Sequence, residues 1–568
     1  MNFKEKLLLL FILILGFSLR FYGINWDQTC CQHPDERAIV MYSQPLKLPN
    51  NLDEFISKDS SLNPHFFAYG NLPLYILRSV SNFAGNFDPQ LATYNQMDLV
   101  GRFISILADT ITILIIFLIA RKLFNANAGF AGSFLYAVSV LPIQYSHFFT
   151  SDILLTFIIS LLLLFVINFY QKPQLKKAII IGILFGLALA TKISAIPIII
   201  SITMAITLDF LFVFLKSPHK PKTWLGHIPH VVRKLISEWL LILLIAFITF
   251  SIAQPYAIID SKEFVDQNML QSMMTKNPYI FPYTLQYVGK IKYIYELKNI
   301  FLWGLGPIIS LLSLCGFYLV YKKFKKMEQT KKSEIVIIVS FLVVYFGVVG
   351  SFAIGFMRYL LPIYPILAIF GGYTIVRILD YINFQKINDQ LKNILKFILI
   401  VSILVWPLSF ITIYSRTNTR IEASNWINQN IPNNSTIAIE HWDDRLPLFT
   451  SNNYNFSELT LYDQPDNKYK WQVLSARLKS SDYLVIASNR LYVPIQKLNN
   501  CSRYRICYPI ASEYYKSLFS GKLPFKLVAE FTSYPTIPFT GTKIIDDMAD
   551  ESFTVYDHPK IFIFKKIP

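Results

Sequence analysis

The chain of 568 residues has few charged side chains and few cysteines for its length. Charged residues make up 16% of it, whereas about 25% is usual for a soluble chain. Hydrophobic residues make up 53% and gather in runs of roughly 18 to 24 residues, the length that a helix needs to cross about 30 Å of hydrocarbon. A string of soluble domains is therefore excluded, and the sequence predicts a multi-pass membrane protein.

The five cysteines form no Cys-x-x-Cys metal motif, and the chain has no internal repeat. Cys315 lies in an apolar run and is expected to be inert. Cys501 and Cys507 can close a small disulfide loop if that region is extracytoplasmic, although spacing alone does not establish the bond. The first apolar run, at 7–24, follows two lysines and lacks a small-residue cleavage site, so we expect a retained signal-anchor helix.

The apolar runs and the charges between them predict a topology. The inner loops of this topology hold 22 Lys/Arg and 6 Asp/Glu, whereas the first outer loop, 25–97, holds 4 and 7. By the positive-inside rule the N-terminus is cytoplasmic, and an odd number of spans puts the C-terminal region outside. The net charge of +17 thus reflects topology, and no nucleic-acid partner is predicted. The eleven expected spans are 7–24, 99–120, 128–146, 152–170, 178–191, 194–215, 239–254, 299–321, 335–353, 359–376 and 397–414.

Two regions follow from this pattern. Residues 1–414 are predicted to form an α-helical transmembrane domain, whose outer loops 25–98 and 255–298 lie along the membrane surface as interfacial helices. Residues 415–568 are predicted to form an extracytoplasmic α/β domain. Its expected elements are a helix at 421–430 and strands at 435–439, 483–487, 553–556 and 561–564.

The segment His33-Pro34-Asp35-Glu36-Arg37 follows the first span on the outer side. An adjacent acidic pair at the bilayer edge can hold one carboxylate as a general base while its neighbour tunes it, and perturbed carboxylates mark working sites. The alternative is a solvated loop, or a helix N-terminus that favours acids.

Four basic residues fall at the outer ends of predicted spans, against the general charge bias: Arg20, Arg102, Lys192 and Arg358. Cations at membrane depth pair with an acid or serve a function. As a group they suit a lipid-linked phosphate that enters sideways from the bilayer, because phosphate prefers Arg and Lys donors. The alternative for each residue alone is snorkelling to the interface or an ordinary ion pair.

These segments resemble the family 39-type glycosyltransferases of the GT-C superfamily, which include protein O-mannosyltransferases and aminoarabinose transferases. The resemblance covers roughly residues 1–414 and suggests a bacterial or archaeal member. The matching pieces, in order, are Arg20 before Tyr22-Gly23, His33-Pro34-Asp35-Glu36, Tyr69-Gly70-Asn71-Leu72-Pro73-Leu74-Tyr75, Gly101-Arg102, Ser146-His147-Phe148-Phe149-Thr150-Ser151-Asp152, Leu189-Ala190-Thr191-Lys192 and Arg358-Tyr359-Leu360-Leu361-Pro362-Ile363-Tyr364-Pro365.

The resemblance implies transfer of a glycosyl group, with inversion, from a polyprenyl-phosphate-linked sugar to an acceptor on the outer face of a plasma membrane. It implies that Asp35 is the base and that Glu36 tunes or orients it. It also implies that Arg102 lies near the lipid phosphate, with Lys192, Arg358 and Arg20 as further candidates. Membrane lipids and a protein, lipid or glycan acceptor are the expected partners.

The chain departs from the aminoarabinose transferases at one segment. Where they carry a Glu-Lys-Pro-Pro stretch that binds a metal and phosphate, this chain has Gly70-Asn71-Leu72-Pro73. His65, and His147 with Asp152, could supply a divalent metal site; the alternative is that these polar residues meet lipid headgroups. The same three residues and Tyr69 are candidates for contact with acceptor or substrate. No cofactor is firmly predicted.

The outer region offers one more candidate group, at Glu440-His441-Trp442-Asp443-Asp444. His441, Asp443 and Asp444 could bind an acceptor glycan or an ion, although Asp also favours turns. Two rival functions stay open. One is a transporter or flippase of lipid-linked sugars, for which the sequence shows little charge at the bilayer midplane and no repeated halves. The other is a non-catalytic assembly subunit.

Overall fold

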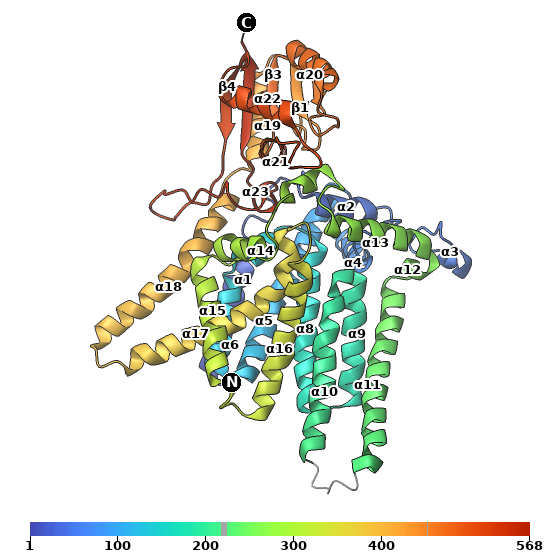
Figure 1. Cartoon of the computed structure of the whole chain (residues 1–568), viewed down its shortest axis with the longest axis vertical. Helices are drawn as coiled ribbons and strands as arrows, with labels where there is room; N and C mark the ends of the chain where they lie inside the picture. Colours follow the sequence, from blue (N-terminus) through green and yellow to red (C-terminus); the bar gives the residue numbers. More distant parts are fainter. Residues whose placement is uncertain (217–223, 451, 568) are drawn as a thin grey trace.

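The protein is a bundle of helices with a sheet-containing domain at one end (Figure 1). The computed structural model describes residues 1–216, 224–450 and 452–567. The multi-pass helical region and the C-terminal α/β region are confirmed. The helices of the bundle are α1 (Phe3–Phe21), α5 (Met97–Leu123), α6 (Ala126–Ala137), α7 (Val140–Ser146), α8 (Ser151–Gln171), α9 (Leu175–Thr191), α10 (Ile199–Lys216), α11 (Trp224–Ala253), α15 (Pro307–Phe324), α16 (Gln329–Val349), α17 (Tyr364–Phe384) and α18 (Asp389–Ile411).

Seven helices in the described part of the chain are long and apolar enough to cross a membrane, or eight if the bent pair α6–α7 counts as one span. Each of the eleven predicted spans falls on a helix or on this pair. Burial separates the spans: 78% of the apolar window of α8 is inside the protein, against 11% for α11. The span Met357–Phe384, which contains α17, is buried to 89%, so the core of the bundle lies around α8 and α17, and α11 lies at its periphery.

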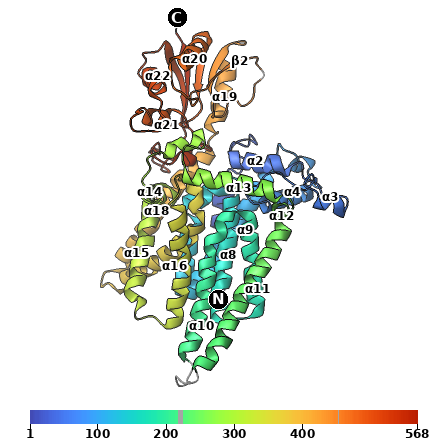
Figure 2. The same ribbon diagram turned by 45° about the vertical axis from the view of Figure 1, so that its right-hand side comes forward.

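Short helices lie at the end of the bundle that carries the outer domain, and α13 lies across this end in both views (Figures 1 and 2). They come from the two predicted outer loops, and this arrangement agrees with interfacial helices. They are α2 (Pro34–Ser43), α3 (Leu52–Ile56), α4 (Leu72–Ala84), η1 (Pro89–Ala92), α12 (Tyr256–Ile259), α13 (Ser261–Lys276), η4 (Pro282–Tyr287), α14 (Ile294–Asn299) and the π-helical turn η5 (Ile300–Gly304).

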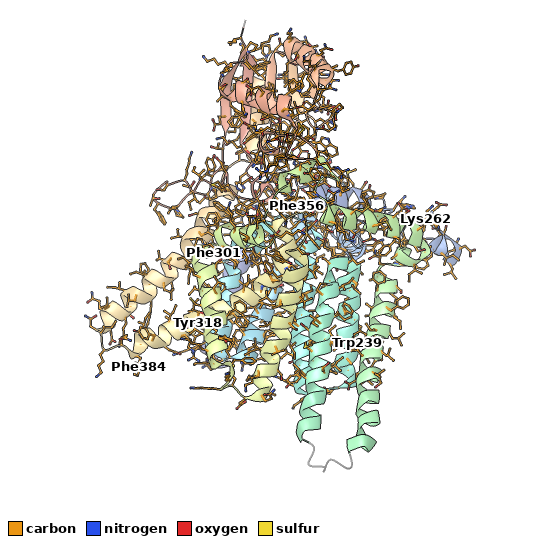
Figure 3. All side chains as sticks on the ribbon, in the orientation of Figure 1. Trp239, Lys262, Phe301, Tyr318, Phe356 and Phe384 are labelled. Carbon is orange, nitrogen blue, oxygen red and sulfur yellow. A yellow bond between two sulfur atoms is a disulfide. The ribbon has the colours of Figure 1, made fainter. Side chains whose placement is uncertain are left out.

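Three 3₁₀ segments interrupt or end spans: η2 (Ile193–Ile198), η6 (Met357–Ile363) and η7 (Thr412–Ser415). Both η2 and η6 contain a proline, Pro197 and Pro362, which removes a backbone donor and prevents a regular α-helix from continuing. Phe356, just before η6, lies where the bundle meets the outer domain (Figure 3). These breaks place polar residues at the outer rim of the bundle.

The outer domain is built on a five-stranded sheet with the order β2-β1-β3-β5-β4. The pairs β1–β2 and β1–β3 are parallel, whereas β3–β5 and β4–β5 are antiparallel. A disulfide joins Cys501 and Cys507. The elements are α19 (Thr419–Asn430), β1 (Thr436–Glu440), β2 (Asn455–Leu459), α20 (Lys468–Ser480), β3 (Tyr483–Ile486), α21 (Tyr492–Lys497), α22 (Pro509–Phe519), β4 (Phe525–Phe531), α23 (Glu551–Thr554) and β5 (Ile561–Lys566).

One predicted strand, 553–556, is wrong. These residues follow Asp550, whose side chain accepts a hydrogen bond from the backbone N–H of Ser552 and starts the short helix α23. The Phe553 ring packs against Trp406 and Phe410 of α18, with ring centroids 6.4 and 5.3 Å apart. The apolar residues that suggested a strand instead anchor the outer domain in the bundle.

Candidate active site

Asp35 stands in the first turn of α2, where the helix N-terminus favours a negative charge. Pro34 occupies the first helical position, a place where its missing N–H costs nothing. The Nδ1 atom of His33 accepts a hydrogen bond from the backbone N–H of Asp35 over 3.2 Å. Burial lowers the pKa of His33 to about 3, so the ring is neutral and serves as a cap. Local sequence thus fixes the orientation of the Asp35 carboxylate.

Four charged side chains from four elements form an alternating row. Asp35 Oδ2 lies 2.9 Å from Nη2 of Arg358, in η6. Arg358 Nε is 3.7 Å from Oδ2 of Asp152, in the first turn of α8. The other oxygen of Asp152 accepts from Nζ of Lys192, at the end of α9, over 2.7 Å. The structure therefore brings two of the four predicted cations, Arg358 and Lys192, together with Asp35. It adds Asp152, which the sequence suggested only as a metal, acceptor or substrate residue.

Asp35 is buried yet remains ionised near neutral pH. Burial by itself would raise the pKa of its carboxyl group, but the Arg358 guanidinium and a hydrogen bond from Tyr69 outweigh burial and hold the pKa below its ordinary value. Lys192 Nζ lies 4.7 Å from the centre of the Tyr359 ring, and the Arg358 guanidinium lies 4.5 Å from that of Phe356. Cation–π contacts with these rings thus stabilise both positive charges.

Several buried polar atoms in this row have no hydrogen-bond partner among the described residues. They are Nε and Nη1 of Arg358, Oδ2 of Asp152, the Tyr145 hydroxyl and Nε2 of His33. Buried polar groups are nearly always paired, so a cluster of unpaired ones calls for an explanation. Donors predominate in the set, as an anionic ligand requires.

A cavity of about 300 Å³ adjoins Lys192 and Tyr69 at the outer rim. Gly70 makes this arrangement possible: a Cβ atom there would lie 1.9 Å from the carbonyl oxygen of Ala190, and its N–H donates to the carbonyl of Thr191. The close approach presses the Tyr69 segment against the end of α9. Other lining residues are Phe67, Leu189, Ile193, Phe250, Phe264, Asn268, Tyr345, Phe352 and Tyr359. The cavity therefore joins an apolar, aromatic wall to the cationic row.

Arg102 lies in a different, closed cluster. Its guanidinium donates two hydrogen bonds to Glu36, two to Asp27 and one to the carbonyl of Ile24, over 2.7 to 3.0 Å. Asp98 is a third carboxylate, 3.3 Å away. A guanidinium has five N–H groups, and all five are used. Arg102 is fully buried and has no donor left for a phosphate, so the predicted phosphate contact does not fit this geometry.

Glu36 and Arg20 are likewise held by internal contacts. Glu36 accepts from Arg102 and from the backbone N–H of Phe149, which ties α2 to the start of α8. Arg20 donates to Asp109 over 2.6 Å and to the carbonyls of Gly16, Ala137 and Tyr136. Arg20 has no exposed surface, and its surroundings do not support a phosphate contact.

The structure does not bring together the three residues considered for a metal. Nδ1 and Nε2 of His147 each face a backbone carbonyl, of Ile143 and Tyr22, at 2.8 Å, which leaves no ring nitrogen for an ion. Asp152 is held by Lys192 and Arg358. His65 lies on the surface, with Nδ1 3.0 Å from Glu263 and 3.7 Å from Asp260. These last three residues could hold a divalent cation.

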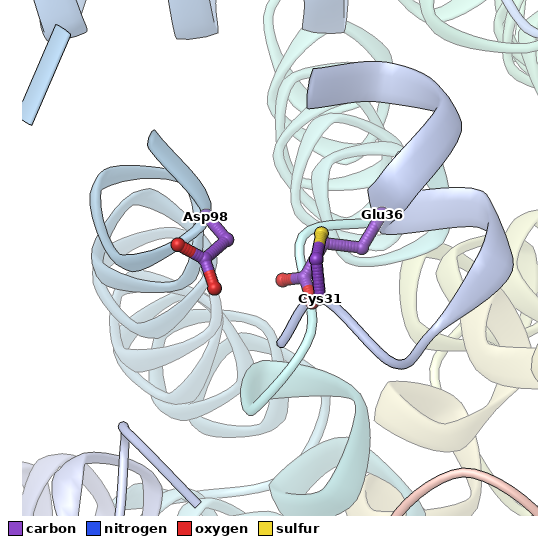
Figure 4. A group of neighbouring side chains, drawn as sticks. All are labelled: Cys31, Glu36 and Asp98. Atoms are coloured by element: carbon purple, nitrogen blue, oxygen red, sulfur yellow. The ribbon is translucent and has the colours of Figure 1, made fainter. Parts of the chain in front are cut away.

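A second group with ligand-like spacing is Cys31, Glu36 and Asp98 (Figure 4). Glu36 and Asp98 are both paired with Arg102, whose positive charge opposes a cation there. Burial raises the pKa of the Cys31 thiol, so the thiolate that metals prefer is disfavoured. This group is part of the closed cluster around Arg102.

The candidate residues of the outer domain pair with the protein's own side chains. Asp443 accepts from Arg420 over 3.2 Å, and Asp444 accepts from Arg37, next to the acidic pair of α2, over 3.1 Å. His441 contacts the glutamate of β2 at 2.8 Å. The expected glycan or ion site at these residues does not fit. Asp443 is held within the outer domain, and Asp444, through Arg37, joins the outer domain to the segment that carries Asp35.

Two aromatic residues near the site were missed by sequence reasoning. The Tyr556 ring, from the outer domain, lies 4.1 Å from the ring of His33. Tyr145, in α7, has a ring centre 6.0 Å from that of His33. Neither stands in a motif, and Tyr556 follows Asp35 by more than 500 residues, so no sequence signal connects them.

Comparison with known proteins agrees with this architecture. Residues 91–253 match the family model for dolichyl-phosphate-mannose-protein mannosyltransferases. The apo oligosaccharyltransferase of Archaeoglobus fulgidus has 11% identity, a TM-score of 0.50 and coverage of 99% of this chain and 88% of its own. The chain has the GT-C fold. The predicted GT-C resemblance is thus confirmed. ArnT from Cupriavidus metallidurans bound to undecaprenyl phosphate is a more distant match, with 13% identity, a TM-score of 0.43 and coverage of 86% and 94%. No curated protein sequence matches significantly.

Proposed function

We propose that this GT-C protein transfers a glycosyl group from a polyprenyl-phosphate-linked sugar to an acceptor at the outer face of the membrane, with inversion. The observation that carries the proposal is the row in which an ionised Asp35 adjoins Arg358, two of whose nitrogens have no hydrogen-bond partner, while Lys192 at the other end of the row lines the cavity. The family model matched by residues 91–253 is named for enzymes with a lipid-phosphate sugar donor, which supports the same donor class.

Arg358 and Lys192 are the proposed phosphate ligands. Nε and Nη1 of Arg358 are free to donate to phosphate oxygens, and Lys192 adds a second positive charge. The leaving polyprenyl phosphate gains negative charge in the transition state, and fixed cations stabilise that charge more in a dry site than in water. The apolar wall of the 300 Å³ cavity suits the first isoprene units of the donor.

Asp35 is the proposed base. Its pKa lies below the ordinary value while Arg358 holds it, so the free site has a charged but weak base. A docked phosphate would share Arg358 and weaken its attraction for Asp35. The carboxylate would then become more basic as the donor binds, when it must accept the proton of an acceptor hydroxyl.

Asp152, Glu36 and Arg102 have positioning roles in this proposal. Asp152 lies between Lys192 and Arg358 and sets their spacing. Glu36 and Arg102 fix α2 against α5 and α8, and with it the direction of Asp35. His65, Asp260 and Glu263 are the residues that would hold a divalent cation if the reaction uses one.

The proposed setting is a bacterial or archaeal plasma membrane with a cytoplasmic N-terminus. The outer domain, α2 and α13 lie at one end of the bundle, and the basic segment between α15 and α16 lies at the other (Figure 1). With positive residues inside, the site opens to the outer leaflet.

The experiment that tests the function is incubation of the purified full chain with a panel of polyprenyl-phosphate sugars. Release of free polyprenyl phosphate, together with glycosylated acceptor or free sugar, is expected for a transferase. A flippase would move the donor between leaflets of a proteoliposome and leave its phosphate–sugar bond intact. Movement of an intact donor would show that the protein is a transporter and not a transferase.

A further inference from the structure

The outer domain contains a second cavity of about 320 Å³, separate from the row of Asp35 and Arg358. It lies between α21, the end of α22 and the neighbouring ends of β4 and β5. Cavities of this size that combine aromatic walls with a few polar groups are typical small-molecule sites. Its lining residues are Asn489, Tyr492, Val493, Gln496, Phe519, Thr532, Ser533, Tyr534, Asp546, Asp547, Thr554, His558, Lys560 and Phe562.

Aromatic rings form one wall of this cavity. The ring centre of Phe519 lies 5.4 Å from that of Tyr492 and 5.4 Å from that of Phe562. Phe519 ends α22 and keeps 41% of its surface exposed. An exposed ring at the edge of a polar cavity offers a flat apolar face, against which the C–H face of a sugar ring can stack.

Other lining residues of the cavity are polar and incompletely paired. Ser533 is only 5% exposed, yet its hydroxyl has no partner among the described residues, and the same holds for the Asn489 side-chain oxygen. The Tyr534 hydroxyl donates to Asp547 over 3.0 Å. Buried unpartnered hydroxyl and amide groups indicate a ligand that both donates and accepts hydrogen bonds.

The charges around the cavity argue against an anionic ligand. His558 lies between two carboxylates, with Nε2 3.0 Å from Asp546 and Nδ1 2.5 Å from Asp557. Burial would lower the pKa of His558, but these carboxylates outweigh burial and raise it to about 10, so the ring carries a compensating positive charge. Lys560 is paired with Glu530 over 3.0 Å. Because carboxylates outnumber cations in this group, an anionic ligand is disfavoured, and a neutral molecule rich in hydroxyl groups matches the unpartnered Ser533 and Asn489 side chains.

One short segment separates this cavity from the candidate active site. Thr554 and His558 line the cavity, whereas Tyr556, between them, packs its ring against His33 beside Asp35. Asp557 accepts hydrogen bonds from Gln144 and Tyr414 of the bundle, over 2.9 and 2.8 Å. The two sites thus share a wall that is fixed to the membrane domain.

We propose that this cavity binds a neutral sugar residue of the acceptor, which makes a glycan the acceptor class. The inference rests on the proposed transferase function. It assigns Phe519 as the stacking residue, with Ser533 and Asn489 as hydrogen-bonding residues.

The test is sugar binding by the full chain in nanodiscs, measured by saturation-transfer NMR with mannotriose, cellotriose and maltotriose as probes. We expect at least one trisaccharide to bind the natural protein and Phe519→Ala to weaken that binding about tenfold. Tyr469→Ala, at an aromatic residue of α20 with 75% exposure outside the cavity, is the matched control and should bind normally. Asp547→Asn, at an exposed carboxylate of the cavity, is a second variant that should also weaken binding.

The inference is overturned if none of the three probes binds at about 10 mM, or if Phe519→Ala and Asp547→Asn bind as tightly as Tyr469→Ala. Unchanged thermal unfolding of Phe519→Ala shows that a loss of binding is local. In the transfer assay the same variant should raise the acceptor KM and leave kcat unchanged. Sugar binding without release of polyprenyl phosphate by the natural protein would refute the transferase, whereas release without sugar binding would refute only this cavity.

Discussion

Arg102 and Arg358 are buried arginines at the outer rim of the same bundle, but their surroundings differ. Arg102 has all five N–H groups bonded, four of them to carboxylates of Asp27 and Glu36. Arg358 has one close carboxylate contact, to Asp35, and two nitrogens without a hydrogen-bond partner among the described residues, one of which lies 3.7 Å from Asp152. A guanidinium whose donors are all used stabilises the fold, whereas a guanidinium with unused donors can bind a ligand. The difference separates a positioning arginine from a proposed substrate-binding one.

The largest expected effect is that of Arg102→Gln on folding. The change leaves the buried carboxylates of Asp27, Glu36 and Asp98 without their shared cation, and breaking a buried ion pair from one side costs about 3 to 5 kcal/mol. We expect this variant to accumulate poorly in the membrane and to unfold well below the natural protein in a thermal assay. Unfolding at the natural temperature would show that the cluster is not what holds α2.

Arg358→Gln should lose less stability than Arg102→Gln, because Arg358 makes one close ion pair whereas Arg102 pairs with three carboxylates, and it should show little transfer. The substitution removes the donors proposed for phosphate, and charge-assisted bonds of this kind are strong, so release of polyprenyl phosphate should fall by about 100-fold or more. Leu360→Met, at a buried neighbour in η6, is the control and should keep activity. Near-normal turnover by Arg358→Gln would remove the distinction between the two arginines.

Lys192→Met should have a smaller effect in the same direction. Lys192 is already paired with Asp152, so the loss is a second charge beside the phosphate. We expect donor affinity to fall by about 10-fold, measured by binding of a labelled polyprenyl phosphate. A variant that binds the donor normally would place the phosphate away from the cavity that Lys192 lines.

The buried ion pairs of His558 with Asp546 and Asp557 should make the stability of the fold depend on pH. The pKa of His558 is raised from 6.5 to about 10 by Asp557 and Asp546, which outweigh burial. Because the pKa of His558 is higher in the folded protein, its protonated ring contributes its full stabilisation below pH 6.5. This contribution is lost as the pH rises through about 10. The natural protein should therefore unfold a few degrees above His558→Gln at pH 6, and the gap should narrow by pH 10. A gap that stays constant over this range would contradict the assignment.

The ion pair of Arg37 with Asp444 should give the smallest effect. Both side chains are partly exposed, and such pairs contribute about 0.2 to 1 kcal/mol. Arg37→Ala and Asp444→Ala are each expected to reduce turnover two- to threefold by loosening α2, and the double variant no further. Additive losses in the cycle would show that the two residues act separately.

The sequence predicted much of the bundle because each span is a long apolar run, and helix formation in lipid satisfies every backbone group internally. It also singled out Asp35, Asp152, Lys192 and Arg358, which the structure brings together. The sequence could not show which of Arg102 and Arg358 is available to bind phosphate, because each is an arginine at the outer end of a predicted span. Asp27, which helps to close the Arg102 cluster, and Tyr556, which comes from the other domain, become neighbours only through folding.

The outer domain shows the same limit. Two strands, β2 and β4, escaped prediction because their residues alternate weakly between buried and exposed positions. The apolar and aromatic composition of segment 553–556 predicts a strand, yet its Phe553 ring is buried against α18. The local pattern of residues indicates which secondary structures a segment can form. Contact with a distant helix then selects the one that it adopts.

The most direct test of the account is the Asp35→Asn variant in the polyprenyl-phosphate release assay, with donor affinity measured alongside. The amide keeps the size of the side chain but cannot accept the acceptor's proton, so we predict that release falls by at least about 1,000-fold while the donor still binds. Release at the natural rate by a correctly folded Asp35→Asn protein would contradict the account, because the base would then lie elsewhere.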